Sequence, residues 1–163
     1  MKLVQRFNLP RSVAALAVLL SMAFATSAGD SPIISSAKDV KWGPAPPSVP
    51  KGAMLAVMAG DPSGTGPVSV RLKLPAGYAI AAHWHPTDEQ VTVLSGTLSI
   101  GMGDALDKKK GTMLRAGGFA IAPAKMHHYA WTKTGGTVQL NLMGPLEVNY
   151  VNPADDPRKA AEH

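Results

Sequence analysis

The chain has 163 residues, of which 45% are hydrophobic and none is cysteine, which suits one globular domain with a sizeable core. The lack of cysteine excludes disulfides, thiolate metal ligands and iron–sulfur centres. The formal net charge is +5, but residues 1–28 hold three basic and no acidic side chains, so residues 29–163 carry 13 basic against 11 acidic residues, or +2. So small an excess, with one dense basic run at 108–110, argues against a nucleic-acid partner.

Residues 1–28 have the pattern of a cleaved secretory signal peptide. Three basic residues precede the apolar run 13–25, and small residues that follow predict cleavage after Ala25 or Ala28. The run is shorter than the roughly 20 residues that a membrane-spanning helix needs. We therefore expect a periplasmic or secreted protein with no stable membrane span after cleavage; an uncleaved membrane anchor is the alternative.

Residues 29–51 are rich in proline and serine. Pro44, Pro46, Pro47 and Pro50 exclude an interior helix or a central strand, because proline lacks the N–H that either would need. We expect a short edge strand near 37–40 and otherwise an extended arm. Such an arm wraps its own domain, reaches a neighbouring subunit or remains a disordered linker.

From residue 52 to residue 155 the pattern is β throughout, and 156–163 is expected to be a polar tail. Short alternating or apolar runs separated by Gly, Pro and Asp predict an antiparallel sandwich or barrel. A tight turn is expected at 95–97. On the last long strand, Gln139 and Asn141 share a face, which either lines the interior or points outward to water. The expected strands are 54–59, 68–74, 78–85, 91–94, 98–102, 112–114, 119–122, 128–132, 138–143 and 146–151.

Four of the five histidines lie in two short stretches beside expected strands. Alternate side chains of a strand share a face, so His83 and His85 project together. Glu89 rejoins them if the strand resumes after the turn at 86–88, and His128 supplies a fourth donor. A His-x-His pair alone is more often merely packed or solvated, but three imidazoles and a carboxylate form a donor set suited to a first-row transition metal.

These two stretches resemble the two sequence motifs of the cupins, over roughly residues 40–155. The residues that match the first motif are Gly77, His83, His85, Glu89 and Gly96, and those that match the second are Gly117, Pro123 and His128. The chain is thus similar to single-domain bacterial cupins of the type-2, or ChrR-like, kind. That resemblance implies an all-β double-stranded β-helix, or jelly-roll barrel, with metal ligands His83, His85, Glu89 and His128.

The chain departs from the second motif at two positions. Lys125 stands where glycine is usual, so the tight turn before His128 would place a non-glycine residue at positive φ. Thr132 stands where asparagine is frequent. Neither departure removes a ligand.

The donor set indicates one divalent transition metal. Mn, Fe or Ni would keep an open position, whereas Zn is possible but would be nearly filled by the same four groups. An ionised Glu89 in an apolar barrel costs several kcal/mol, so without metal we expect a raised Glu89 pKa or water in the cavity. His127 cannot share the face of His128 and is expected at the rim, or as an alternative ligand; Tyr78 and Lys125 are weaker candidates at the mouth.

The sequence contains no nucleophile elbow, phosphate-binding glycine loop or thiol nucleophile, so any catalysis would run through the metal. Two functions stay open. The first is an exported metal-dependent oxidase or dioxygenase acting on a small molecule, since many cupins with this donor set use oxygen. The second is a non-catalytic cupin that binds or senses a metal or small molecule, because one fold hosts many functions. A homodimer is possible.

Overall fold

The computed structural model describes residues 32–159 of the chain, and every described strand lies in the unit that begins at Ile33. The predicted signal peptide lies outside the described residues. The only helices among the described residues are two single 3-10 turns, η1 (Ala37–Asp39) and η2 (Pro153–Asp155). No helix in this described part is long and apolar enough to cross a membrane.

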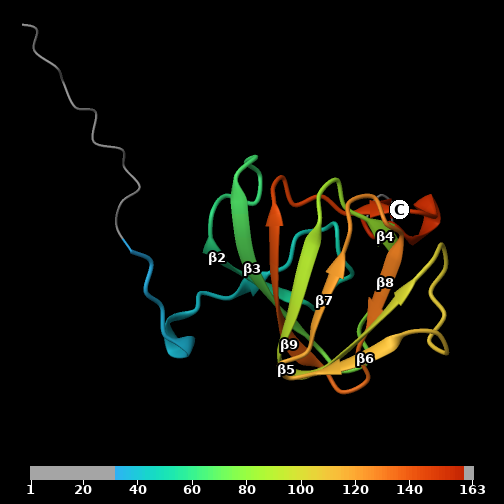
Figure 1. Cartoon of the computed structure of the whole chain (residues 1–163), viewed down its shortest axis with the longest axis horizontal. Coiled ribbons are helices and arrows are strands. Elements are labelled where there is room, and N and C mark those ends of the chain that lie inside the picture. Colours follow the sequence, from blue (N-terminus) through green and yellow to red (C-terminus); the bar gives the residue numbers. More distant parts are fainter. Residues whose placement is uncertain (1–31, 160–163) are drawn as a thin grey trace, which may run out of the picture. The chain divides into compact units, whose positions relative to one another are not determined.

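The described fold is a set of antiparallel strands arranged in two sheets that share one strand (Figure 1). One sheet has the order β1-β2-β3-β9-β5-β7, and the other has the order β6-β5-β8-β4-β10. The expected all-β jelly-roll fold is confirmed. The strands are β1 (Gly43–Pro44), β2 (Met54–Ala59), β3 (Pro67–Leu74), β4 (Ala79–Trp84), β5 (Glu89–Met102), β6 (Thr112–Arg115), β7 (Phe119–Ala122), β8 (His128–Trp131), β9 (Gly136–Met143) and β10 (Asn149–Tyr150).

Strand β5 runs without interruption for 14 residues, so the tight turn expected at 95–97 is wrong. Its first half pairs with β9 and its second half with β8, and the pairing with β9 shifts register around Leu94. Gly96 has φ +70°, and a Cβ there would lie 2.2 Å from the Gly135 carbonyl oxygen. The glycine therefore marks a bulge where the strand bends from one sheet into the other, rather than a hairpin.

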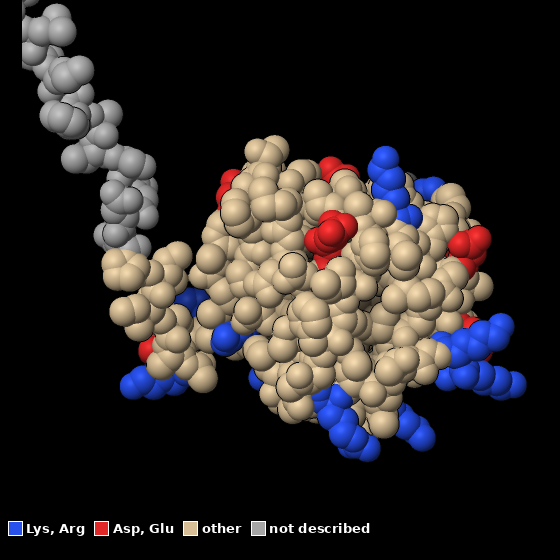
Figure 2. Space-filling model, viewed as in Figure 1, with Lys and Arg blue, Asp and Glu red and all other residues tan. Residues whose placement is uncertain are grey.

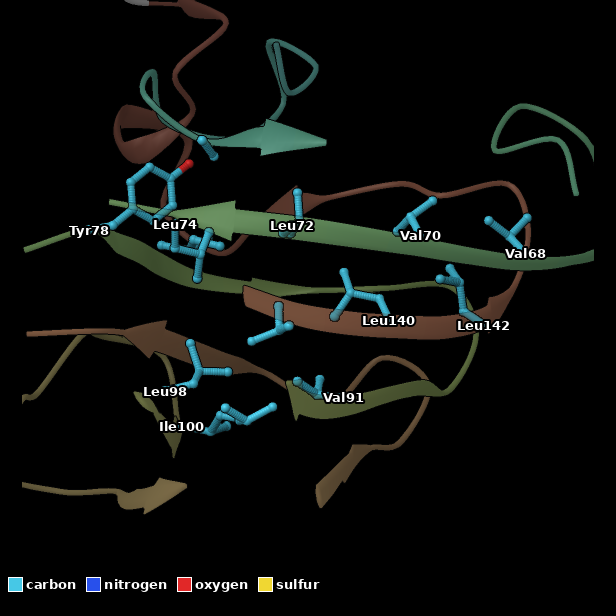
Figure 3. Packing of buried hydrophobic residues seen from close by; sticks show 14 residues of the cluster. Val68, Val70, Leu72, Leu74, Tyr78, Val91, Leu98, Ile100, Leu140 and Leu142 are labelled. Carbon is cyan, nitrogen blue, oxygen red and sulfur yellow. The ribbon is translucent and has the colours of Figure 1, made fainter. Parts of the chain in front are cut away.

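The core is an aliphatic cluster between the two sheets (Figure 3). On β3, Val70 and Leu72 point inward, while Arg71 between them points outward, as the alternation in the sequence predicts. Val138 and Leu140 of β9 and Ile100 of β5 meet them from the other strands. Burial of each such side chain contributes about 1.5–3 kcal/mol, so this cluster provides the main support of the barrel.

The amide side chains of β9 face outward, which decides between the two alternatives for Gln139 and Asn141. Their neighbours Val138, Leu140 and Leu142 are the buried face of the strand. The Arg71 Nε donates a hydrogen bond to Gln139 Oε1 at 3.0 Å on the outer face of the sheet. These amides therefore do not line the barrel interior.

The proline-rich arm packs on its own barrel from Trp42 onward, whereas residues 32–39 are exposed. Gly43 and Pro44 form β1 and pair with the edge of β2. The Lys73 Nζ lies 5.7 Å from the ring centroid of Trp42, a cation–π contact. The edge strand expected near 37–40 is instead the 3-10 turn η1, because Ser36 bonds the Asp39 side chain and its carbonyl accepts the Asp39 N–H at 2.9 Å.

Charged side chains are dispersed on the face drawn in Figure 2, where lysine and arginine lie along the periphery and form no continuous patch. The basic run at 108–110 lies in the loop between β5 and β6. In that loop Lys110 Nζ is 3.6 Å from an oxygen of Asp107, with both side chains exposed. The run is thus part of a solvated hairpin loop.

Candidate metal centre

Strands β4 and β8 place two of the predicted histidines opposite each other. His83, near the end of β4, pairs with His128, the first residue of β8. The pairing of these strands shifts register between Ile80 and His83. Without that bulge, residues three apart would point to opposite faces; with it, Ile80 and His83 both reach the interior.

The other two predicted donors flank the turn that joins β4 to β5. His85 follows β4, and Glu89 is the first residue of β5. The Lys125 N–H donates to the His85 carbonyl at 2.8 Å, so the two histidine segments are bonded to each other. Lys125 has φ +63°, which confirms that the tight turn survives with lysine in the left-handed conformation, at a cost of roughly 1–2 kcal/mol.

All four side chains meet inside the barrel, each between 3% and 6% exposed. One ring nitrogen from each of His83, His85 and His128 lies within 4.8 Å of the others. The Glu89 oxygens are each 3.5 Å from a histidine Nε2, one from His85 and one from His128. The three histidines form a cluster that could bind a metal.

The backbone fixes which ring nitrogen of each histidine faces the centre. Nδ1 lies 2.7 Å from the Ala81 carbonyl in His83, 2.5 Å from the Glu147 carbonyl in His85, and 3.0 Å from the Met126 carbonyl in His128. Because a carbonyl only accepts, each Nδ1 carries the hydrogen, so in the neutral imidazole each Nε2 is left with a lone pair.

These lone pairs are the strongest sign that the centre fits a cation. The Nε2 atoms of His85 and His128 are buried without a hydrogen-bond partner, and their 3.5 Å separation from Glu89 exceeds the 2.7–3.2 Å of an N–H···O bond. Unpartnered buried polar atoms are rare and costly. A divalent cation would satisfy all of these atoms together, so the residues present fit a metal.

Burial and the contacts among the three histidines and Glu89 shift the pKa values of the centre. Burial, with the neighbouring His128 and His85, lowers the pKa of His83 to about 3. Burial alone would raise the pKa of Glu89, but His85 and His128 outweigh it and lower the pKa to about 2. Burial alone would lower the pKa of His128, but the adjacent Glu89 carboxylate raises it. The expected rise of the Glu89 pKa is therefore wrong, because the histidines stabilise its anion.

Two cavities of about 40 Å³ each adjoin the centre. One lies among aliphatic side chains that include Leu98 and Ile100, beside His83 and Glu89. The other lies between the same centre and the arm, where Pro46 and Val49 contribute to its wall. Pockets for ordinary small molecules are about 300–1,000 Å³, so the closed barrel holds only a ligand of a few atoms.

The weaker predicted candidates lie away from the histidine cluster. His127 points outward, and its Nδ1 is 2.7 Å from an exposed Asp104 oxygen. Tyr78 is buried at the edge of the core, and its hydroxyl donates to the Pro50 carbonyl. No sequence pattern pointed to the carbonyl of Glu147, which orients His85 from 62 residues away.

The comparisons with known proteins agree with this architecture. Residues 29–163 match the protein family described as "Domain of unknown function (DUF4437)", and no curated protein matches the chain. The polyketide cyclase RemF from Streptomyces resistomycificus is a similar solved structure, with 18% identity, a TM-score of 0.56 and coverage of 80% of this chain and 92% of that one.

Two further solved structures show the same fold. An RmlC-like cupin from Shewanella frigidimarina is 16% identical over 69% of this chain and 91% of that one, with a TM-score of 0.54. KdgF from Halomonas sp. is 17% identical over 68% of this chain and 90% of that one, with a TM-score of 0.50. The predicted resemblance to cupins is confirmed: the chain belongs to the DUF4437 family and has the cupin fold.

Proposed function

We propose that this protein is an exported metal-binding cupin whose ligands are His83, His85, Glu89 and His128. One observation carries the proposal: buried Nε2 atoms converge beside a carboxylate, and those of His85 and His128 have no partner of their own. With a divalent metal, three neutral imidazoles and one carboxylate leave a net charge of about +1. Mn, Fe or Ni is preferred, and Zn is possible.

The reaction class that we propose is that of an oxidase or dioxygenase acting on a small molecule. A metal with four protein ligands supplies an open position that binds and polarises a small ligand. The chain's own residues orient the donors through the carbonyls of Ala81, Glu147 and Met126, and the aliphatic core keeps bulk water from the centre. The similarity to RemF, a polyketide cyclase, leaves non-redox chemistry on the same scaffold as the competing enzyme class.

A non-catalytic metal or small-molecule binder is the second candidate. Its support is the size of the cavities, about 40 Å³ on either side of the centre. A site so small is suited to holding a metal with water or a small anion. It would turn over a larger substrate only after part of the wall had moved.

Export is supported by the position of the family match. The match begins at residue 29, immediately after the cleavage point predicted at Ala28. The basic start, short apolar run and small residues before that point fit a secretory signal. Mass determination of protein recovered from the periplasm should give a mature N-terminus near residue 26 or 29, and recovery of the intact chain in the membrane fraction would contradict cleavage.

Metal analysis tests the central proposal. Protein isolated from its native host should hold about one equivalent of a first-row metal, which His83→Ala should lose while remaining folded. A His83→Ala protein that retains the metal would remove the assignment.

Oxygen uptake separates the enzyme from the binder. The Fe- or Mn-loaded protein should consume oxygen with a member of a panel of small phenols, diketones or organic acids. Uptake that persists in His83→Ala would place the reaction elsewhere, and the absence of uptake across the panel favours the binder.

A further inference from the structure

The wall between the proposed metal centre and solvent is one residue thick where the arm crosses it. His83, His85 and Glu89 line one side of a cavity of about 40 Å³, and Pro46, Ser48 and Val49 line another. Pro46 is at the same time exposed to solvent. Displacement of this short segment, Pro46–Pro50, would therefore open the cavity directly to the outside.

Few bonds hold this segment in place. Pro46, Pro47 and Pro50 have no N–H to donate, and the Val49 N–H is used within the segment, bonding the Pro46 carbonyl at 3.1 Å. On the side before Pro46, the Ala45 N–H still bonds the Ala53 carbonyl at 3.1 Å. From Pro46 onward the segment thus lacks the ladder of backbone bonds that fixes an ordinary edge strand.

Two tyrosine hydroxyls supply the missing attachment. Tyr150 donates to the Ser48 carbonyl at 3.0 Å and Tyr78 to the Pro50 carbonyl at 2.5 Å. The Val49 side chain, between these two anchor points, is 9% exposed and fills the wall. Tyr150 is also in contact with the centre, since its ring centroid is 6.0 Å from that of His83.

We propose that the segment Pro46–Pro50, latched by Tyr78 and Tyr150, determines which ligands reach the metal centre. With the latch closed the centre admits only molecules of a few non-hydrogen atoms; a larger substrate enters only after the segment has detached. This inference rests on the proposed function for its biological meaning, but the wall itself exists with or without metal.

The first experiment uses metal-free protein and needs no activity. Diethyl pyrocarbonate modifies accessible neutral imidazoles, and peptide mapping reports each histidine separately. In the wild type, His83, His85 and His128 should react far more slowly than the exposed His127, which serves as the internal standard.

The double variant Tyr78→Phe/Tyr150→Phe removes both attachments and keeps both rings. Loss of two hydrogen bonds should raise the open population, and with it the modification rate of the buried histidines, on the order of 10- to 100-fold, with His127 unchanged. Tyr129→Phe is the matched control: its hydroxyl also donates to two loop carbonyls, those of Asp107 and Lys110, but that loop does not line the cavity.

Val49→Ala is a second test in case the double variant fails to fold. It removes part of the wall and leaves both tyrosine hydroxyls unchanged. It should raise the modification rate less than the double variant does. The proposal is overturned if the wild-type buried histidines react as fast as His127, or if neither variant exceeds Tyr129→Phe.

The second experiment uses Co(II)-loaded protein and follows its visible spectrum. Azide should perturb the wild-type spectrum while the bulkier 4-phenylimidazole does not, and the double variant should bind both. Equal binding of both probes to the wild type would overturn the size limit. Failure of the wild type to take up cobalt would count against the proposed function alone, since the modification experiment would still decide whether the wall exists.

Discussion

In two regions of the barrel, a tyrosine hydroxyl attaches a neighbouring segment by donating to its backbone carbonyls, but the two segments cover different things. On one side, Tyr78 and Tyr150 bond the carbonyls of the arm that covers the histidine cluster. On the other, Tyr129 bonds two carbonyls of the loop 103–111, and Asp104 of that loop pairs with His127 at the surface. The arm region encloses buried Nε2 atoms that have no hydrogen-bond partner, whereas the described residues of the loop contain no such atom. A tyrosine–carbonyl bond alone therefore does not indicate a functional site. The buried side chains that the attached segment covers do.

His127 and His128 are adjacent in sequence but face opposite ways, so replacing each in turn gives the sharpest test of this comparison. His128→Ala should weaken metal binding by more than about 100-fold, beyond the 10–100-fold typical of residues that only orient ligands, because it removes a converging Nε2. His127→Ala should leave the affinity unchanged, because this ring points outward. Competitive chelator titration measures both variants, and equal losses would place the metal at the rim.

Acid should weaken metal binding at the histidine cluster beneath the arm, because protons compete with the metal for the ring nitrogens. The metal can displace a proton from His128, whose pKa is raised by Glu89, but not from His83, whose pKa is about 3, nor from Glu89, whose pKa is about 2. Affinity should therefore begin to fall at a pH somewhat above 6.5, the ordinary value for histidine, with a slope of log affinity against pH below the value of three expected for three ordinary histidines. Titrations between pH 5 and 7 measure the slope, and a flat profile would contradict histidine ligation.

Alkali should loosen the arm region through its tyrosines. Burial raises the pKa of Tyr78 to about 12, so the folded protein resists an ionisation that the unfolded chain undergoes near pH 10. The stability that this provides is complete below pH 10 and is lost as pH rises toward 12. Urea denaturation at pH 9 and 11 should show a smaller loss in Tyr78→Phe than in the wild type; equal losses would mean that this tyrosine is not the cause.

The smallest effect is expected on the loop side. Asp104→Ala removes an exposed partner of His127, and exposed ion pairs contribute less than about 1 kcal/mol. The free energy of unfolding should change by no more than that, with metal affinity unaltered. A larger loss in denaturant titrations would show that this loop carries more of the fold than its exposure indicates.

Side-chain alternation was sufficient to predict much of the site. Because alternate residues of a strand share a face, the positions of His83, His85 and Glu89 already implied that they converge, and the second histidine stretch pointed to His128. Alternation also predicted the buried faces of β3 and β9. These are local properties, set by spacing within a strand or across one short turn.

The features that the sequence could not reveal depend on distant segments or on bulges. Nothing near Leu94 distinguishes a bulge from a turn, since glycine at Gly96 suits both, and only pairing with β9 decides. The direction of the Glu89 pKa shift follows from its proximity to His85 and His128, which meet it only in the folded barrel. The role of the arm as a wall likewise depends on hydroxyls that come from β10 and from the residue before β4.

Strand β5 makes the two sheets mechanically inseparable. Its first half supplies Glu89 and pairs with β7 and β9, and its second half pairs with β6 and β8. A backbone break within it would therefore cost the protein both sheets and the carboxylate at once. An insertion in the exposed loop 103–111 would spare every one of these pairings, which makes that loop the natural point for a reporter domain.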